Sequence, residues 1–273
     1  MNWATSLRKE ISQKAKEYAE RNNIPYYLSL GSSPAVIFES YEGGTLHGNF
    51  LPSSYKAILN DRFWSSRLKK PHQQSKALPI GKRGQAAELD SCNSSDALLM
   101  NIFCNPKASR ASPLAKLFGQ GKLPRPEFGV EGRVPLSNGE KDATEIDMQL
   151  GNLFVEAKFT EADFTDKPKV HVERYRDFKE VFELSALPQN NDAYFNYQLI
   201  RNILAAYAHG AAFFLMCDAR RPDLLRSWWN VMRCIKPVQL RLRCHFVLWQ
   251  EIADALPVGL QKFLEEKYGI GMK

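Results

Sequence analysis

Two acidic residues and a lysine in the middle of the chain have the types and spacing to form a metal-binding site. Asp147 precedes Glu156 and Lys158, and the dipeptide Gly151-Asn152 between them suits a two-residue β-hairpin turn. In such a hairpin Asp147 faces Glu156 on the neighbouring strand. Two facing carboxylates repel each other and destabilise a sheet. A divalent cation such as Mg²⁺, which prefers oxygen ligands, would make the same arrangement favourable.

The predicted hairpin has two chemically different faces, because successive side chains of a strand point to opposite sides of the sheet. One face is entirely apolar and carries Ile146, Met148, Leu150, Leu153, Val155, Ala157 and Phe159. The other face carries Glu145, Asp147, Gln149, Phe154, Glu156 and Lys158. The alternative to a metal site is a solvated face with a cross-strand ion pair between Glu145 and Lys158.

Asp147 and the triplet Glu156-Ala157-Lys158, placed on either side of a short turn, resemble the signature of the PD-(D/E)XK nuclease superfamily. Ile146 stands where that signature usually has a proline. The resemblance implies a Mg²⁺-dependent nuclease, with Mn²⁺ able to substitute, in which Asp147 and Glu156 bind the metal. Lys158 would orient the attacking water or help to deprotonate it. The Ala157 carbonyl would complete the coordination sphere, since backbone oxygens are good ligands for hard cations.

The resemblance also suggests supporting residues on the helices before and after the hairpin. Related nucleases often carry an acidic residue on the helix before the sheet; Glu88 is the candidate here and Asp96 the alternative. On the following helix, Gln198 would support the metal-bound water or a phosphate. Arg201, which shares a helix face with Gln198, would bind a phosphate. Each of these residues could instead be an ordinary surface group.

The charge balance of the chain suits a polyanionic partner. The sequence has 37 Lys and Arg against 30 Asp and Glu, with a net charge of +7 and a pI of about 9.1. Two basic, loop-like stretches, 69–83 and 105–126, would neutralise phosphates if the partner is a nucleic acid, and are otherwise solvated loops. The candidate phosphate contacts in them are Lys82, Arg83, Lys107 and Arg110. DNA is favoured over RNA through the resemblance alone, since no RNA-binding signature is present.

Hydrophobic periodicity and turn residues predict an α/β protein. Helices are expected at 2–22, 53–68, 84–104, 193–209 and 224–232, with two helical pieces over 250–267. Ser94 or Ser95 could cap the second part of 84–104, which leaves open a break near Asn93. Strands are expected at 26–30, 35–38, 128–134, 144–150, 153–159, 210–217 and 240–249. The apolar run 210–217 after a long helix implies parallel pairing inside a sheet.

The order of elements from 84 to 218 resembles the restriction-endonuclease-like core, a central mixed sheet flanked by helices in the order αβββαβ. We expect a single domain over 1–273, with an N-terminal α+β extension over 1–83. Residues 219–273 would add C-terminal helices and a strand. This last part is strongly basic, with Arg220, Arg221, Arg226, Arg233, Arg241 and Arg243.

Other classes of protein are disfavoured by what the sequence lacks. The five cysteines are odd in number and form no C-x-x-C pair, which argues against a zinc site or a disulfide framework. No stretch of the sequence reaches about 18 uninterrupted apolar residues, so no membrane span is expected. The basic N-terminus lacks the apolar core of a secretory signal, so a cytoplasmic protein is expected.

The alternative function is a catalytically inactive protein that binds nucleic acid or a partner on the same scaffold. The sequence does not set the oligomeric state, and a homodimer is compatible with it.

Overall fold

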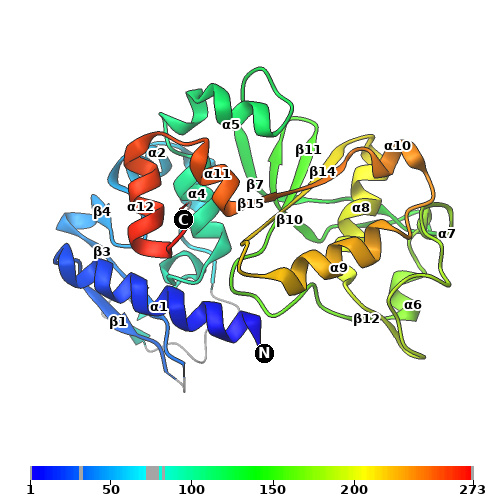
Figure 1. Ribbon diagram of the computed structural model, residues 1–273, viewed down its shortest axis with the longest axis horizontal. Coiled ribbons are helices and arrows are strands. Elements are labelled where there is room, and N and C mark those ends of the chain that lie inside the picture. Colours follow the sequence, from blue (N-terminus) through cyan, green and yellow to red (C-terminus); the bar gives the residue numbers. More distant parts are fainter. Residues whose placement is uncertain (1, 31–32, 72–79, 82–83, 272–273) are drawn as a thin grey trace. The chain divides into compact units, whose positions relative to one another are not determined.

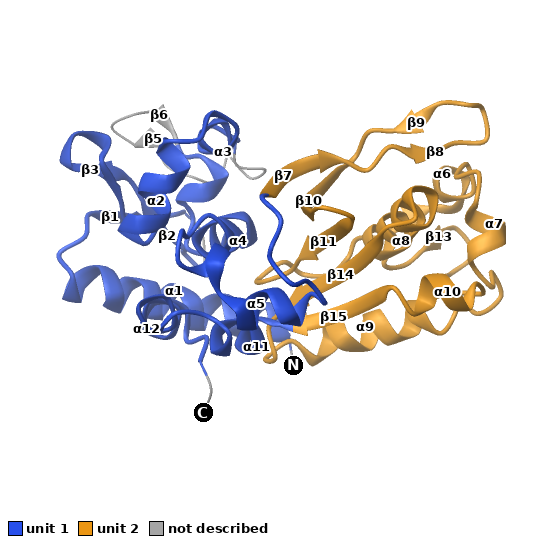
Figure 2. Cartoon of the chain, turned by 90° about the horizontal axis from the view of Figure 1, so that it is seen from above, with its two compact units in different colours: residues 1–125, 248–273 blue, residues 126–247 orange. Residues whose placement is uncertain are grey.

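The computed structural model describes residues 2–30, 33–71, 80–81 and 84–271. The chain forms two compact units, residues 1–125 together with 248–273 and residues 126–247 (Figure 2). We call them unit 1 and unit 2. The single domain expected from the sequence stays a prediction. Among the described residues, no helix combines the length and the apolar character that a membrane span requires.

Unit 1 is mainly helical. Its elements are α1 (Trp3–Arg21), β1 (Tyr26–Leu28), β2 (Val36–Phe38), β3 (Ser40–Tyr41), η1 (Glu42–Gly44), β4 (Leu46–His47), α2 (Pro52–Leu59), α3 (Arg62–Arg67), β5 (Ile80–Gly81), β6 (Gly84–Gln85), η3 (Glu88–Asp90), α4 (Ser95–Phe103), η4 (Ala108–Arg110), α5 (Ser112–Leu117), α11 (Trp249–Asp254) and α12 (Val258–Tyr268). The predicted amphipathic helix 2–22 is confirmed as α1. It packs against α12 and buries Ala4, Leu7, Ile11, Ala15 and Ala19.

The predicted segment 84–104 breaks near Asn93, as its serines suggested, and its first half is not α-helical. The α-helix begins only at Ser95, and the Ser94 hydroxyl caps it by accepting a hydrogen bond from the Ala97 N–H at 3.1 Å. Upstream, the Ser91 hydroxyl accepts from the Asn93 N–H at 3.3 Å. Side chains of this kind compete with the helical hydrogen bonds of the backbone and favour a turn. Glu88 therefore lies in the 3-10 turn η3 and not on the helix.

Unit 2 contains the five-stranded sheet and the helices around it. Its elements are β7 (Pro126–Glu131), β8 (Val134–Pro135), β9 (Lys141–Asp142), β10 (Glu145–Leu150), β11 (Leu153–Ala157), β12 (Lys167–Pro168), α6 (Lys169–Val172), α7 (Phe178–Val181), β13 (Ala193–Tyr194), α8 (Tyr197–His209), β14 (Ala212–Cys217), α9 (Pro222–Met232), α10 (Val238–Arg241) and β15 (Cys244–Leu248).

The central sheet is mixed, as predicted, and its strand order is β15-β14-β11-β10-β7. Strands β7, β10 and β11 pair antiparallel, whereas β11 and β14 pair parallel. The hairpin register is the predicted one, with Met148 paired to Val155 and Gln149 to Phe154. Gly151 makes the turn with a φ of 58°, a left-handed value that glycine adopts without steric cost.

Helix α8 lies against β11 and β14 and beside α9 (Figure 1). It begins at Tyr197, four residues later than predicted, because Ala193 and Tyr194 pair with Lys167–Pro168 as a short strand. The helix ends at Gly210, whose φ of 62° closes it with a left-handed residue.

Two predicted strands also differ from the structure. The segment 240–249 divides into helix α10 and strand β15. Pro237, which lacks an N–H and sets the backbone for a helical turn, precedes α10, and its carbonyl accepts from the Arg241 N–H at 3.1 Å. The predicted strand 128–134 is shifted to Pro126–Glu131, while Val134 pairs with Asp142 in a separate two-stranded hairpin.

Candidate active site

The polar face of the hairpin is largely enclosed. Glu156 is 1% exposed and Lys158 is 5% exposed, while Asp147 is half-buried. The apolar face is buried as well, from Ile146 to Ala157. Helix α8 packs on β11 and brings Asn202 against Glu156, which explains why this face is not solvated.

Asp147 lies where the regular pairing of the hairpin ends. One of its carboxylate oxygens, Oδ2, accepts a hydrogen bond from the backbone N–H of Ala157 at 2.8 Å. The register that pairs Met148 with Val155 places Asp147 opposite Glu156. The negative charges of both residues act on the Lys158 ammonium, so the two acids and the lysine form one cluster.

Both oxygens of Glu156 are held by partners. Its Oε1 atom is 2.9 Å from the Lys158 ammonium, and its Oε2 atom accepts from the Asn202 side-chain amide at 2.7 Å. Lys158 thus pairs with Glu156 and not in the solvated arrangement with Glu145 that the sequence left open. Asn202 is 0% exposed, and the sequence analysis missed it. The sequence did offer one signal for it: Asn202 is a polar residue between Ile200 and Ile203, in a helix that must pack on a sheet.

Arg201 supports this cluster indirectly, through Asn202 and the backbone of β10. Its guanidinium donates to the side-chain oxygen of Asn202 at 2.8 and 3.0 Å and to the Glu145 carbonyl at 2.9 Å. The side chain is buried, at 4% exposure. In this arrangement Arg201 positions Asn202 and β10; its role as a phosphate ligand stays a prediction.

The surroundings of Lys158 keep it charged. Burial alone would lower its pKa, but the negative charges of Glu156, Glu161 and Asp147 and the hydrogen bond to Glu156 outweigh that effect, so the pKa lies above its usual value. The ammonium also lies 5.7 Å from the centre of the Phe164 ring. Glu161 is a third nearby carboxylate that the sequence analysis did not select. Its Oε2 atom accepts from the Phe159 N–H at 2.6 Å.

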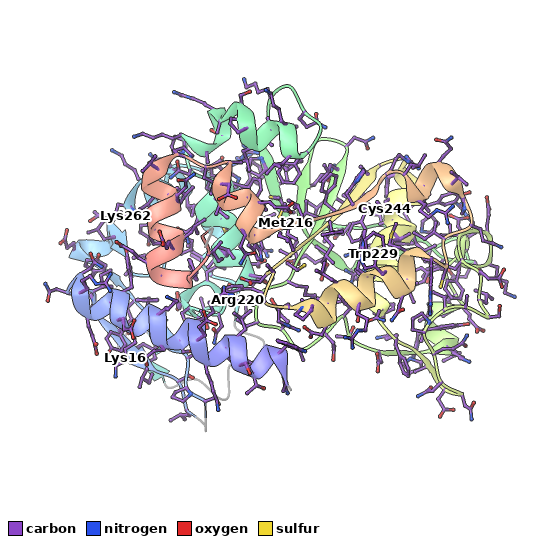
Figure 3. The ribbon with its side chains drawn as sticks, in the orientation of Figure 1. Lys16, Met216, Arg220, Trp229, Cys244 and Lys262 are labelled. Carbon is purple, nitrogen blue, oxygen red and sulfur yellow. The ribbon has the colours of Figure 1, made fainter. Side chains whose placement is uncertain are left out.

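A fully buried arginine holds the loop that follows Lys158. The Arg221 guanidinium donates to the carbonyls of Phe159, Glu161 and Ala162 at 3.3, 2.7 and 2.9 Å, and it pairs with Asp223 at 2.8 Å. The sequence analysis counted Arg221 only as part of a basic tail, yet its exposure is 0%. Its neighbour Arg220, labelled in Figure 3, pairs with the buried Asp218 at 2.6 Å.

Gln198 lies one helical turn before Asn202 and on the same side of α8. Its backbone N–H donates to the Phe164 carbonyl at 3.0 Å, which places it near the residue that borders Lys158. Its Oε1 atom is buried and has no hydrogen-bond partner among the described residues. A buried amide oxygen without a donor is costly, and a water or ligand donor would satisfy it.

The donor set fits a hard divalent cation. Asp147, Glu156 and the Ala157 carbonyl all offer oxygen, the atom that Mg²⁺ and Mn²⁺ prefer. A carboxylate oxygen that accepts one hydrogen bond keeps a second lone pair for a metal. Among the described residues, no group of three or more His, Cys, Asp or Glu side chains is arranged to hold a metal. A cation here would therefore depend on two carboxylates and the backbone carbonyl.

Other predicted residues belong to unit 1. Glu88 and Asp96 share the Lys70 ammonium, at 3.4 and 3.0 Å, and Asp96 also pairs with Arg67 at 2.8 Å. Burial and the nearby Asp96 charge raise the pKa of Glu88. Lys107 and Arg110 are exposed at either end of the short turn η4. Lys82 and Arg83 lie outside the described residues.

These observations define an α/β protein whose central mixed sheet presents an acidic hairpin with a buried lysine, an arrangement compatible with a restriction-endonuclease-like core. The model of one protein family, described as restriction endonuclease associating with ARP, matches residues 3–269. The match covers nearly the whole chain, so the chain belongs to this family. A search of curated proteins and a search of solved structures each found no match. The membership indicates a nuclease-related function and an interaction with nucleic acid.

Proposed function

We propose that this chain is a metal-dependent nuclease of the PD-(D/E)XK type that hydrolyses phosphodiester bonds, with DNA as the favoured substrate. The observation that carries the proposal is the cluster of Asp147, Glu156 and Lys158, with Lys158 2.9 Å from Glu156. Family membership supports the nuclease class. The preference for DNA rests on the resemblance of the hairpin motif alone.

In this proposal, Asp147, Glu156 and the Ala157 carbonyl hold Mg²⁺ or Mn²⁺. A bound divalent ion stabilises charge on the scissile phosphate and lowers the pKa of a bound water. Lys158 is charged in the arrangement described, so it acts by donating hydrogen bonds to the water or phosphate and not as a proton acceptor. Asn202 fixes the orientation of Glu156, and Gln198 offers its buried Oε1 atom to a donor such as water.

Two measurements on the same proteins test this function. Calorimetry with Mn²⁺ should detect binding to the wild type and a loss of affinity of at least about tenfold in Asp147→Asn and Glu156→Gln. Glu183→Gln, a change at an exposed carboxylate of unit 2, should bind as the wild type does. Plasmid, linear and single-stranded DNA, with RNA as a comparison, should be cleaved in Mg²⁺ or Mn²⁺. Activity that persists in Lys158→Ala would point to a contaminant or another site.

The second candidate function is an inactive binding protein on the same scaffold. It is favoured by one observation, the enclosure of the Glu156–Lys158 pair at 1% and 5% exposure. In that case, neither the wild type nor Glu156→Gln would bind Mn²⁺, no DNA would be cleaved, and DNA affinity would be the same in both proteins.

We also infer that the chain acts together with ARP, because the family description names this association. Co-purification of ARP with the chain from cells that contain both would support this. Separate elution of ARP and the chain at micromolar concentrations would argue against it.

A further inference from the structure

An exposed phenylalanine in unit 1 lies close to two arginines. Phe63, on helix α3, is 60% exposed, so it contributes little to the core. The guanidinium carbon of Arg62 is 4.6 Å from the centre of the Phe63 ring, and that of Arg125 is 5.8 Å from it. Arg125 is also 5.2 Å from the Trp64 ring. Two cations and an exposed aromatic ring are thus gathered at one place on the surface.

This group is held in place by Asp61. The Asp61 Oδ1 atom accepts from the backbone N–H groups of Phe63 and Trp64, at 2.9 and 3.2 Å, and so fixes the start of α3. Its Oδ2 atom is 2.5 Å from the Arg125 guanidinium. One carboxylate therefore holds both the backbone that carries the ring and the arginine beside it, which reduces the entropy lost when a ligand binds.

The chemistry of the group matches an unpaired nucleobase. Bases of single-stranded nucleic acid stack on exposed aromatic rings and on arginine planes, while nearby cations neutralise the phosphates. Exposed Lys69, just after α3, and exposed Lys122 add positive charge in the same segments of unit 1. By contrast, Trp229 on α9 (Figure 3) is similarly exposed at 57%, but its ring contacts the Phe246 ring at 5.8 Å.

We propose that Arg62, Phe63 and Arg125 form a stacking site for an unpaired base of a nucleic acid. This deepens the proposed function by naming its substrate class: single strands, frayed ends or bases turned out of a duplex. A base inside an intact duplex has no free face for the ring, so duplex binding does not use Phe63.

Fluorescence anisotropy with labelled oligonucleotides in EDTA tests the site without metal or cleavage. Phe63→Ala should bind a thymidine oligonucleotide roughly 5- to 150-fold more weakly than the wild type. Phe63→Trp should restore the affinity, and Val258→Ala, a change at another exposed apolar residue of unit 1, should leave it unchanged. An abasic oligonucleotide of the same length should bind wild type and Phe63→Ala equally, as should a blunt hairpin duplex. Circular dichroism and thermal melting confirm that each variant is folded.

The salt dependence gives an independent check on the arginines. Arg62→Gln should reduce the slope of log affinity against log salt by about 0.7 for single strands, as expected for one lost phosphate contact. Loss of affinity for the abasic strand in Phe63→Ala, or no loss for the thymidine strand, would overturn the proposed site. If Phe63 affects binding but no metal-dependent cleavage occurs, the nuclease function fails and this site stands. If metal-dependent cleavage occurs but Phe63 does not affect binding, the stacking site fails and the nuclease function stands.

Discussion

Two buried lysines, one in each unit, have opposite surroundings and opposite pKa shifts. Lys158 in unit 2 lies among Glu156, Glu161 and Asp147, and their negative charges raise its pKa despite burial. Lys267 in unit 1 is 0% exposed and donates to the Asn49 side-chain oxygen at 2.7 Å and to the Gly48 carbonyl at 3.3 Å. Burial lowers the pKa of Lys267 well below its usual value.

The aromatic neighbours of Lys267 do not replace a carboxylate. Its ammonium lies 4.6 to 5.9 Å from the centres of four rings, those of Phe38, Tyr268, Phe263 and Tyr18. Cation–π attraction is worth about 2 kcal/mol when desolvated, whereas the effective penalty for burying an ion is several kcal/mol. The pKa of a buried lysine is thus raised where anions surround it and lowered where they do not, and unit 2 supplies the anions.

The largest effect is expected from breaking the charged pair. Lys158→Met should lower the free energy of unfolding by about 3–5 kcal/mol in metal-free buffer, because Glu156 is then buried without its cation. Urea unfolding measures the loss. The double variant Glu156→Gln/Lys158→Met should recover most of it, and a loss below about 1 kcal/mol in the single variant would show that the pair is not desolvated.

A divalent cation should partly replace the missing lysine. Mn²⁺ at a hundredfold excess over its dissociation constant stabilises a folded protein by about 2.7 kcal/mol. If Asp147 and Glu156 bind it, the thermal shift in Mn²⁺ should be larger for Lys158→Met than for the wild type, since the variant lacks the competing ammonium. Lys267→Met serves as the control and should shift as the wild type does. Equal shifts in all three proteins would contradict a metal site at the hairpin.

The pH dependence of stability should separate the two lysines. Because the pKa of Lys267 is lower in the folded than in the unfolded state, the unfolded state binds more protons and stability rises with pH. Stability is highest above the unfolded pKa of about 10.4 and falls as the pH is lowered toward the folded pKa. As the pH rises through that window, the free energy of unfolding of the wild type should increase by up to about 1.4 kcal/mol per pH unit relative to that of Lys267→Met. Parallel pH profiles of unfolding would mean that Lys267 is charged in the folded protein.

The smallest effect is expected from lysines on the surface. Lys16 pairs with Glu20 at 3.8 Å on α1, and Lys262 with Glu266 at 3.7 Å on α12 (Figure 3). Exposed pairs of this kind contribute about 0.3–0.5 kcal/mol. Lys16→Met and Lys262→Met should therefore change the free energy of unfolding by less than about 0.5 kcal/mol each. A larger loss that disappears in high salt would show that these pairs belong to a wider charge network.

Features that depend on residues close together in the chain could be predicted from the sequence, whereas contacts between distant residues could not. The hairpin register was predictable because the turn at Gly151 and the alternation of apolar residues are local features. The break near Asn93 was predictable from the local serines, whereas the helical start at 84 was wrong because side chains near Ser91 favour a turn over the periodic pattern. Asn202 was missed because its partner Glu156 lies 46 residues away in the chain. Arg221 was missed because the carbonyls it contacts, those of Phe159, Glu161 and Ala162, lie 59 to 62 residues away.

By itself, the sequence determined that Asp147 faces Glu156, that Lys158 shares their side of the hairpin, and that the opposite side is apolar. These follow from strand alternation and a two-residue turn, which act between neighbours. Only the tertiary structure decided that the acidic side is covered by α8 and that both oxygens of Glu156 are engaged. It also decided that the pKa of one buried lysine is raised and that of the other is lowered, because a pKa depends on the groups that folding brings close.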